Sequence, residues 1–236
     1  MRTILLAVAI LTLTCVVSSA DIFLTEGPVT VSGTTPSWSG SVSIPKFDPS
    51  WGYLLGITVA LDSDLTDTNI GFENLDTSAH DITTAASASI LLKRPDNTLI
   101  TSTAPASTPN TFKAHAYDGS NDYNGPSGHT YPKIEGNDSN QYLVGPVIPA
   151  EDLLYFVGTG NVILNVDATQ TAVANMFSGY NVNPGKFTIN PLGAISSDAH
   201  VTVTYDYRTF VPEPGSAALL LLGLPMAGVW FRRRRK

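Results

Sequence analysis

The sequence of 236 residues has a single cysteine, Cys15, which lies inside the first apolar run. If this run is removed on export, the remaining protein has no thiol, which excludes disulfides, thiolate metal sites and cysteine nucleophiles. Long helical periodicity is also lacking between Asp21 and Phe210, which argues against a helical body. The stability of the body must therefore come from burial of apolar side chains.

Basic residues are scarce away from the two ends of the chain. Of the 13 Lys and Arg, six are Arg2 and the run Arg232–Lys236, which leaves seven against 20 Asp and Glu, a formal charge of −13. Such a surface repels nucleic acid, so no nucleic-acid partner is expected. An acidic body rich in Ser, Thr and Asn suits solubility outside the cell and can hold divalent cations weakly.

The first 20 residues, MRTILLAVAILTLTCVVSSA, predict a secretory signal peptide. One positive charge at Arg2 precedes an apolar run that is too short to span a membrane comfortably, and Ser18 and Ala20 supply the small residues that a signal peptidase needs. Cleavage is expected after Ala20, following export by the Sec machinery. Lipidation of Cys15 is the less favoured alternative, because Thr14 stands where a lipoprotein has a small residue.

The C-terminus, residues 211–236, combines a rigid polar turn, an apolar stretch and a block of positive charge. Pro212 and Pro214 favour an extended, exposed segment that a processing enzyme can grip. The apolar stretch 217–231 would be about 22 Å long as a helix, against roughly 30 Å of hydrocarbon, so it predicts a marginal transmembrane segment. The stop signal Arg232, Arg233, Arg234, Arg235 and Lys236 should stay in the cytoplasm, with the body on the far side.

This tail resembles the PEP-CTERM sorting signal, through Val211, Pro212, Glu213 and Pro214 followed by the apolar stretch and the arginines. The resemblance implies recognition by an exosortase, a membrane-embedded protease-transpeptidase of Gram-negative bacteria that make extracellular polysaccharide. It also implies cleavage near Pro212 to Pro214, after a transient stay in the inner membrane. The alternative is a plain C-terminal anchor that is never processed.

Short apolar stretches separated by Gly, Pro, Asn and Asp predict one all-β domain over residues 21–210, a β-sandwich or jelly roll. The clearest strand is His200–Thr209, in which Val and Tyr alternate with Thr and Asp. Gly40–Lys46 and Gly52–Leu61 show the same period, and we expect these two strands to pair or lie side by side.

Weaker patterns predict the rest of the domain. Further strands are expected at Ile70–Leu75, Ser87–Lys93, Tyr142–Val147, Leu153–Val157, Val162–Val166 and Phe187–Ile189. Thr169–Phe177 fits a helical turn or another strand, and Tyr117–Asp138 is expected to be a long surface loop.

The body also resembles the choice-of-anchor E domains, which are exported bacterial domains of undefined activity with alternative C-terminal anchors. The residues that carry this resemblance are Ser43–Ser50, Gly52–Leu61 and Val201–Tyr205. The resemblance implies a location at the cell surface more than it implies a chemistry.

Signals for catalysis are weak. The four histidines, His80, His115, His129 and His200, form no HxH or HExxH arrangement, and no G-x-S-x-G sequence presents a nucleophilic serine. Paired carboxylates for glycoside hydrolysis stay open, because the two acids need only meet in space. The sequence therefore predicts a protein that is not an enzyme.

A calcium site is the one cofactor that the sequence suggests. Asp62–Asn69 places oxygen ligands between two strands, with Asp62, Asp64 and Asp67 as candidates, although the EF-hand spacing is absent. Asp118–Asn124 and Asn137–Asn140 have a similar composition. For all three segments a solvated turn held by Asx hydrogen bonds is the favoured alternative.

Aromatic side chains next to polar loops offer a second route to binding, because sugar rings stack on exposed Trp and Tyr. The candidates are Trp38, Trp51, Tyr117, Tyr123 and Tyr131, and the alternative is that the two tryptophans close the ends of the core. The sequence as a whole predicts an exported structural or interaction protein of the cell surface or extracellular matrix, with extracellular polysaccharide as a candidate partner. The competing prediction is a secreted carbohydrate-binding module or polysaccharide-active enzyme.

Overall fold

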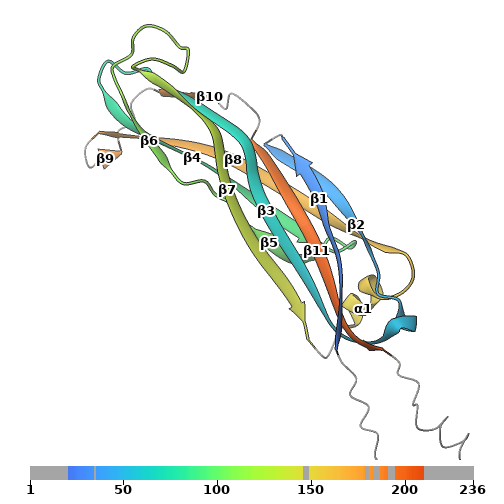
Figure 1. The fold of residues 1–236 in the computed structure, drawn as a ribbon. Coiled ribbons are helices and arrows are strands. Elements are labelled where there is room, and N and C mark those ends of the chain that lie inside the picture. Colours follow the sequence, from blue (N-terminus) through green and yellow to red (C-terminus); the bar gives the residue numbers. More distant parts are fainter. Residues whose placement is uncertain are drawn as a thin grey trace, which may run out of the picture.

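The computed structural model describes residues 21–34, 36–145, 149–178, 181–182, 187–190 and 195–209. These residues form an all-β body in which two antiparallel sheets face each other (Figure 1). The all-β prediction is confirmed. The predicted signal peptide, 1–20, and sorting segment, 211–236, lie outside the described residues.

The first sheet is built around β3 (Gly52–Asn74), the longest strand. It contains β1 (Ile22–Gly33), β3, β7 (Gly128–Val144), β10 (Phe187–Asn190) and β11 (Ser196–Thr209). β11 pairs with β1 and β3, and β3 also pairs with β7 and β10.

The second sheet is built around β4 (His80–Lys93) and β8 (Asn161–Ser178). β8 pairs with β2 (Ser37–Pro45), β4 and β9 (Asn181–Val182), and β4 also pairs with β5 (Leu99–Thr103) and β6 (Asn110–Ala114). Two short helical segments, η1 (Pro49–Trp51) and α1 (Ala150–Phe156), connect strands.

Alternating burial explains why these segments are strands. In β11 every second residue from Ser197 to Tyr205 is buried, while the residues between them are partly exposed. Side chains of a strand point to opposite faces in turn, so one face of β11 lines the core and the other meets water. The predicted strand His200–Thr209 is confirmed and extended at its start.

The expected neighbourhood of Gly40–Lys46 and Gly52–Leu61 is wrong. These segments lie in β2 and β3, which belong to opposite sheets. The turn between them contains η1, where the Asp48 carboxylate accepts a hydrogen bond from the Ser50 N–H at 2.8 Å. This connection carries the chain from one sheet to the other, so strands that are consecutive in the sequence lie in different layers.

The predicted strand Leu153–Val157 is also wrong, because its first four residues lie in the helix α1. Tyr117–Asp138 is only partly a loop, since β7 begins at Gly128. Thr169–Phe177 is a strand within β8, which settles that alternative. The remaining predicted strands coincide with parts of β3, β4, β7, β8 and β10, and residues 146 and 147 of Tyr142–Val147 lie outside the described residues.

The core lies between the two sheets and is filled by inward-facing aliphatic side chains of both. Its fully buried members include Ile44, Ile57, Val59, Leu61, Leu65, Ile90, Leu92, Leu164, Val166, Val201 and Val203. Tyr205 is also fully buried, and its hydroxyl donates a hydrogen bond to the Pro45 carbonyl oxygen at 2.8 Å, which ties the two layers together. Burial raises the pKa of the Tyr205 hydroxyl, so it stays a donor at physiological pH.

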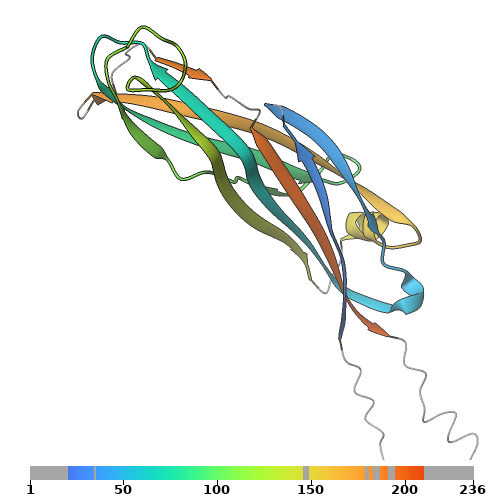
Figure 2. The ribbon, with the colours of Figure 1, turned by 45° about the horizontal axis from the view of Figure 1, so that its top comes forward.

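Both ends of the described chain lie at one end of the sandwich (Figure 1, Figure 2). Ile22 of β1 pairs with Tyr207 of β11, and Arg208 Nε lies 2.6 Å from Asp21 Oδ1. Two segments that are almost 190 residues apart in the sequence are therefore adjacent in space. We call this end, where Asp21 and Thr209 lie, the terminal end.

A buried ion pair fixes α1 against the strands. Arg94 donates to Asp152 Oδ1 through Nε at 3.1 Å and through a terminal nitrogen at 2.7 Å, and Asp152 is fully buried. The Tyr142 hydroxyl donates to Asp152 Oδ2 at 3.0 Å, and the guanidinium lies over the Tyr142 ring. Both carboxylate oxygens are therefore satisfied inside the protein, which is what makes a buried charge tolerable.

We expect Asp152→Asn to lower the free energy of unfolding by roughly 3 kcal/mol or more, because it leaves the Arg94 charge buried and unpaired. The matched control is Lys93→Met. It removes the neighbouring Lys93–Asp167 pair, which is partly exposed, and should cost less than about 1 kcal/mol. Chemical denaturation measures both values. Equal losses in the two variants would contradict this account of the cluster.

Candidate functional site

A polar groove crosses the outer face of the first sheet, between β3 and β7. Asp62 pairs with Ser139 and Asp64 with Asn137 in the strand register, so their side chains meet along the groove. The residues that line it are Ala60, Asp62, Ser63, Asp64, Asn137, Asp138, Ser139, Asn140 and Gln141. It contains Asp62 and Asp64, two of the acids that the sequence analysis singled out.

The acids of the groove are partly engaged by protein groups. Asp64 Oδ2 lies 3.2 Å from His200 Nε2, and the other ring nitrogen of His200 lies 2.8 Å from the Thr30 hydroxyl. The Asp138 carboxylate accepts hydrogen bonds from the Ala104 N–H at 2.7 Å and the Ser139 N–H at 2.9 Å. Asp62 is exposed and faces the open part of the groove.

The predicted calcium ligands Asp62, Asp64 and Asp67 do not sit in a turn. The segment Asp62–Asn69 is part of β3, and the register shifts between Leu65 and Thr68. Period-2 alternation places Asp62 and Asp64 on one face, whereas the side chain of Asp67 lies outside the described residues. Across the described part of the chain, no three His, Cys, Asp or Glu side chains are grouped to hold one metal ion. Calcium binding stays a prediction.

The other two acidic segments differ from each other. Asp118–Asn124 forms consecutive Asx turns, in which Asp118 accepts from the Ser120 N–H at 2.9 Å and Asp122 from the Asn124 N–H at 3.0 Å. The solvated-turn alternative is therefore confirmed for that segment. Asn137–Asn140 is not a turn, because it lies inside β7.

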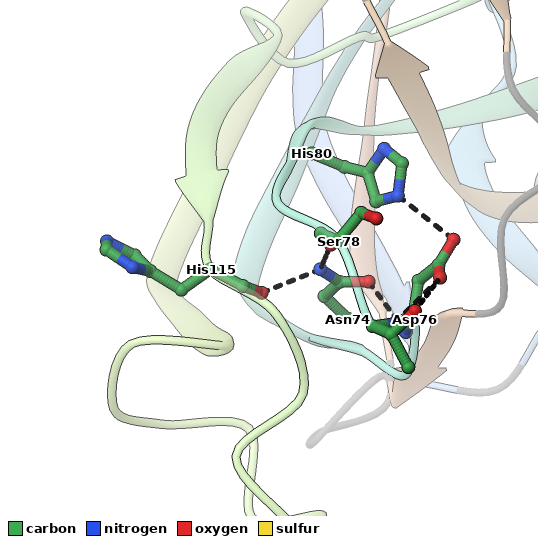
Figure 3. Close-up of polar contacts among 6 residues, drawn as sticks. Asn74, Asp76, Ser78, His80 and His115 are labelled. Atoms are coloured by element: carbon green, nitrogen blue, oxygen red, sulfur yellow. Dashed lines mark hydrogen bonds and ion pairs between the residues drawn. The ribbon is translucent and has the colours of Figure 1, made fainter.

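A second polar cluster, which the sequence analysis missed, lies in the turn between β3 and β4 (Figure 3). The Asp76 carboxylate lies 3.0 Å from His80 Nε2 and accepts a hydrogen bond from the Thr77 N–H at 2.7 Å. The buried Asn74 amide donates to the carbonyl oxygens of Ser78 and His115 at 2.8 and 2.7 Å. These bonds join the turn to the segment that follows β6.

The geometry of this cluster is that of a structural brace. His80 is only 5% exposed, and its Nδ1 is buried without a hydrogen-bond partner among the described residues. A general base must reach the proton that it removes, and this ring does not open to solvent. Ser78 enters the cluster through its carbonyl oxygen, and the His115 ring points away from it (Figure 3). An Asp and a His four residues apart are the one local signal that the sequence offered.

The aromatic candidates mostly belong to the body of the fold. Trp38 packs against the core and donates from Nε1 to the Ser197 hydroxyl at 3.0 Å. Tyr131 packs in an aromatic cluster with Phe72, and His129 lies between Tyr131 and Phe112, stacked on the latter. Trp51 and Tyr117 are each 39% exposed, and the Trp51 ring meets the Phe47 ring edge to face. Trp38 is therefore part of the core packing, and Trp51 is partly packed and partly exposed.

Helices of the described residues are too short or too polar to cross a membrane. The predicted segment 217–231 is not among those residues.

The body resembles several chains of solved structures. One is from the structure of the infectious bursal disease virus Gx strain (14% identity, 83% of this chain covered, TM-score 0.15). They also include a CocE/NonD family hydrolase from Staphylococcus aureus (9%, 81%, 0.18) and a family two carbohydrate esterase from Cellvibrio japonicus (10%, 83%, 0.15). This chain spans 38%, 33% and 36% of their lengths, and likenesses this distant carry no argument about function. No curated protein matches the chain.

The tail gives a specific match. Residues 210–236 match the PEP-CTERM protein-sorting motif, which confirms the resemblance drawn from Val211–Pro214 and the apolar and basic residues after it. The motif indicates a protein that is exported and sorted through the membrane toward the cell surface, with exosortase as its processing enzyme. The match begins one residue after β11 ends at Thr209.

The hydrogen bonds of Asp76 predict how its contribution to stability depends on pH. The hydrogen bonds from His80 and from the Thr77 N–H lower the pKa of Asp76, so its contribution to stability is present above the ordinary carboxyl pKa and is lost as the pH falls through the lowered value. We expect His80→Leu to raise the pKa of Asp76 toward its ordinary value. Carbon-detected NMR titration of the carboxyl groups measures this shift.

Asp96 is the internal control for that titration. Hydrogen bonds from the Thr98 side chain and N–H lower its pKa independently of His80. A low pKa of Asp76 that persists in His80→Leu would show that the histidine does not hold the carboxylate.

Proposed function

We propose that this chain is an exported structural or interaction protein of the cell surface or extracellular matrix, which exosortase sorts through its C-terminal segment. The observation that carries the proposal is the PEP-CTERM match over residues 210–236, directly after the last strand of the body. The position of the match leaves the folded body whole when the tail is cut.

The sequence of each end supplies the steps of sorting. The signal peptide directs the chain across the inner membrane, and the apolar stretch 217–231 then enters the bilayer with Arg232–Lys236 on the cytoplasmic side. Pro212 and Pro214 keep the segment before the span extended, so that exosortase can grip and cleave it outside the bilayer. The short span keeps the intermediate marginally stable in lipid, which suits a protein that is to be released or transferred.

The body is proposed to act by contact and not by catalysis. Three of its histidines are engaged in the fold: His80 with Asp76, His129 with the aromatic cluster, and His200 with Asp64 and Thr30. The acidic outer face of the first sheet, including the groove at Asp62, is the surface that we propose for contact with the matrix. The resemblance to choice-of-anchor E domains supports the same location and leaves the partner open.

We expect Pro212→Ala with Pro214→Ala to block removal of the tail in a host that carries exosortase. Exchange of both prolines removes the backbone restraint that keeps the cleavage segment extended. The mass of the protein recovered from the wild-type strain should lack the C-terminal residues, and the variant should retain them in the membrane fraction.

The matched control is Pro109→Ala with Pro132→Ala, which changes two exposed prolines of the body and should leave processing intact. Deletion of exosortase should reproduce the effect of the tail variant. A tail that is removed equally well in the absence of exosortase would refute the proposed sorting route.

A further inference from the structure

Exposed apolar side chains gather at the terminal end of the sandwich. Phe23 is 67% exposed and pairs with Asp206, and Tyr53 is 66% exposed and pairs with Arg208. Leu143, which is 63% exposed, also lies on this part of the first sheet.

Two of these side chains, Phe23 and Leu143, share the outer face of the first sheet. Thr25 and Thr204 point outward, because their hydroxyl oxygens lie 3.1 Å apart on the exposed face. Leu143 belongs to the same row through its partner Thr58, which pairs with Thr204. Phe23 lies two residues before Thr25 on the same strand and so faces the same way. Tyr53 pairs with Arg208 near the end of the pairing between β3 and β11.

Trp51 extends this surface around the edge of the sandwich. It ends η1, directly before Gly52, which pairs with Thr209. Its ring packs edge to face on Phe47 and remains 39% exposed. We call Phe23, Trp51, Tyr53 and Leu143 the apolar rim.

The chain that follows Thr209 limits how far the rim can be from a membrane. Seven residues, 210–216, separate Thr209 from Ala217, where the predicted span begins. Even a fully extended connection covers at most about 29 Å over these eight steps. The lipid headgroup region is itself roughly 6 Å thick on each side of the hydrocarbon. While the span is inserted, the terminal end therefore lies no further from the start of the span than the length of this connection.

The chemistry of the rim matches the boundary between lipid and water. Trp and Tyr concentrate at that boundary because their rings are apolar and their edges are polar. Of the charges next to the rim, Asp21 and Arg208 form an ion pair. The opposite end of the sandwich differs, because its loop carries the exposed acids Asp118 and Asp122.

We propose that the apolar rim rests on the lipid surface of the inner membrane while the tail is still inserted. This inference depends on the proposed sorting function, which puts the span in the bilayer. The contact keeps the terminal end of the body facing the membrane. The segment 210–216 then lies between the folded sandwich and the membrane, where a membrane-embedded protease works. Removal of the tail then leaves only a weak interfacial contact, which allows the body to leave.

The test uses the full chain in vesicles of phosphatidylglycerol and phosphatidylcholine, with bromine on the phosphatidylcholine acyl chains close to the headgroup. Bromine quenches tryptophan fluorescence at short range, and the chain has three tryptophans, Trp38, Trp51 and Trp230. Trp51→Phe leaves Trp230 to report insertion of the tail, and Trp230→Phe leaves Trp51 to report contact of the rim. Trp38 is kept in both chains, and the double variant Trp51→Phe with Trp230→Phe measures its contribution alone. Trp38 is hydrogen-bonded to Ser197, which lies 12 residues along β11 from Thr209, about 40 Å from the terminal end, so it should not be quenched.

We expect bromine-dependent quenching of both Trp51 and Trp230. Phe23→Ser with Tyr53→Ser should abolish the quenching of Trp51 and leave that of Trp230. The matched control is Val173→Ser, an exposed apolar residue of β8 away from the rim, which should change neither signal.

The outcomes separate the two proposals. Quenching of Trp230 without quenching of Trp51 would overturn the contact of the rim and leave sorting intact. Absence of quenching at both positions would show that the tail does not insert, and both proposals would fall. Trp51 could also escape quenching by bromine only at high protein density in the vesicles, with chemical cross-links between copies. That result would show that the rim contacts a second copy of the chain and not lipid, and it would overturn the inference.

Discussion

The pairing of β11 with β1 and β3 is the interaction on which the architecture depends. It makes the last strand of the body a central strand of the first sheet, which pairs with β3 from Ser196 to Thr209 and with β1 from Ser197 to Tyr207. Because β11 is the last strand in the sequence, the sheet is completed only when the end of the body is available for pairing. Its two partners come from the first third of the chain, so closure of the sheet joins the beginning of the body to its end.

This closure also brings the two ends of the body to the same end of the sandwich. The ion pair between Asp21 and Arg208 and the register of Ile22 with Tyr207 put both ends of the body at one place. The two proposed address segments, one before residue 21 and one after Thr209, are therefore joined to the body at the same end of the fold. The opposite end carries the Asx turns of Asp118–Asn124 and the brace of Asp76 and His80. The proposed contact with lipid would therefore be made by one end of the sandwich and leave the outer face of the first sheet, with its groove at Asp62, open to solvent.

Local patterns predicted the features that local residues determine. The alternation in His200–Thr209 predicted β11, and the order of Pro-Glu-Pro, apolar stretch and arginines predicted the sorting motif, because each signal is contiguous in sequence. The neighbourhood of strands was not predictable in the same way. Gly40–Lys46 and Gly52–Leu61 have the same period, but the choice of sheet depends on partners more than 80 residues away, Val162 for Ile44 and Val203 for Val59.

Polar residues were harder to interpret for the same reason. Leu153–Val157 has the composition of a strand, yet the buried pairing of Asp152 with Arg94, 58 residues distant, fixes a helix there. Asp62 and Asp64 read as a turn because acids are rare in strands, but the wet face of β3 accepts them. In the cluster of Asp76 and His80, the Asn74 amide donates to the carbonyl oxygens of Ser78 and His115, and backbone acceptors leave no trace in the sequence.

The arrangement of the two ends can be measured directly, because the body contains no native cysteine. Thr25 and Thr204 face each other on the exposed surface with hydroxyl oxygens 3.1 Å apart, so Thr25→Cys with Thr204→Cys brings two thiols within disulfide geometry. The account predicts that the exported double variant forms this disulfide without loss of folded protein, whereas each single variant stays reduced. A double variant that is folded and exported but has free thiols would contradict the closure of the sheet, and with it the shared position of the two address segments.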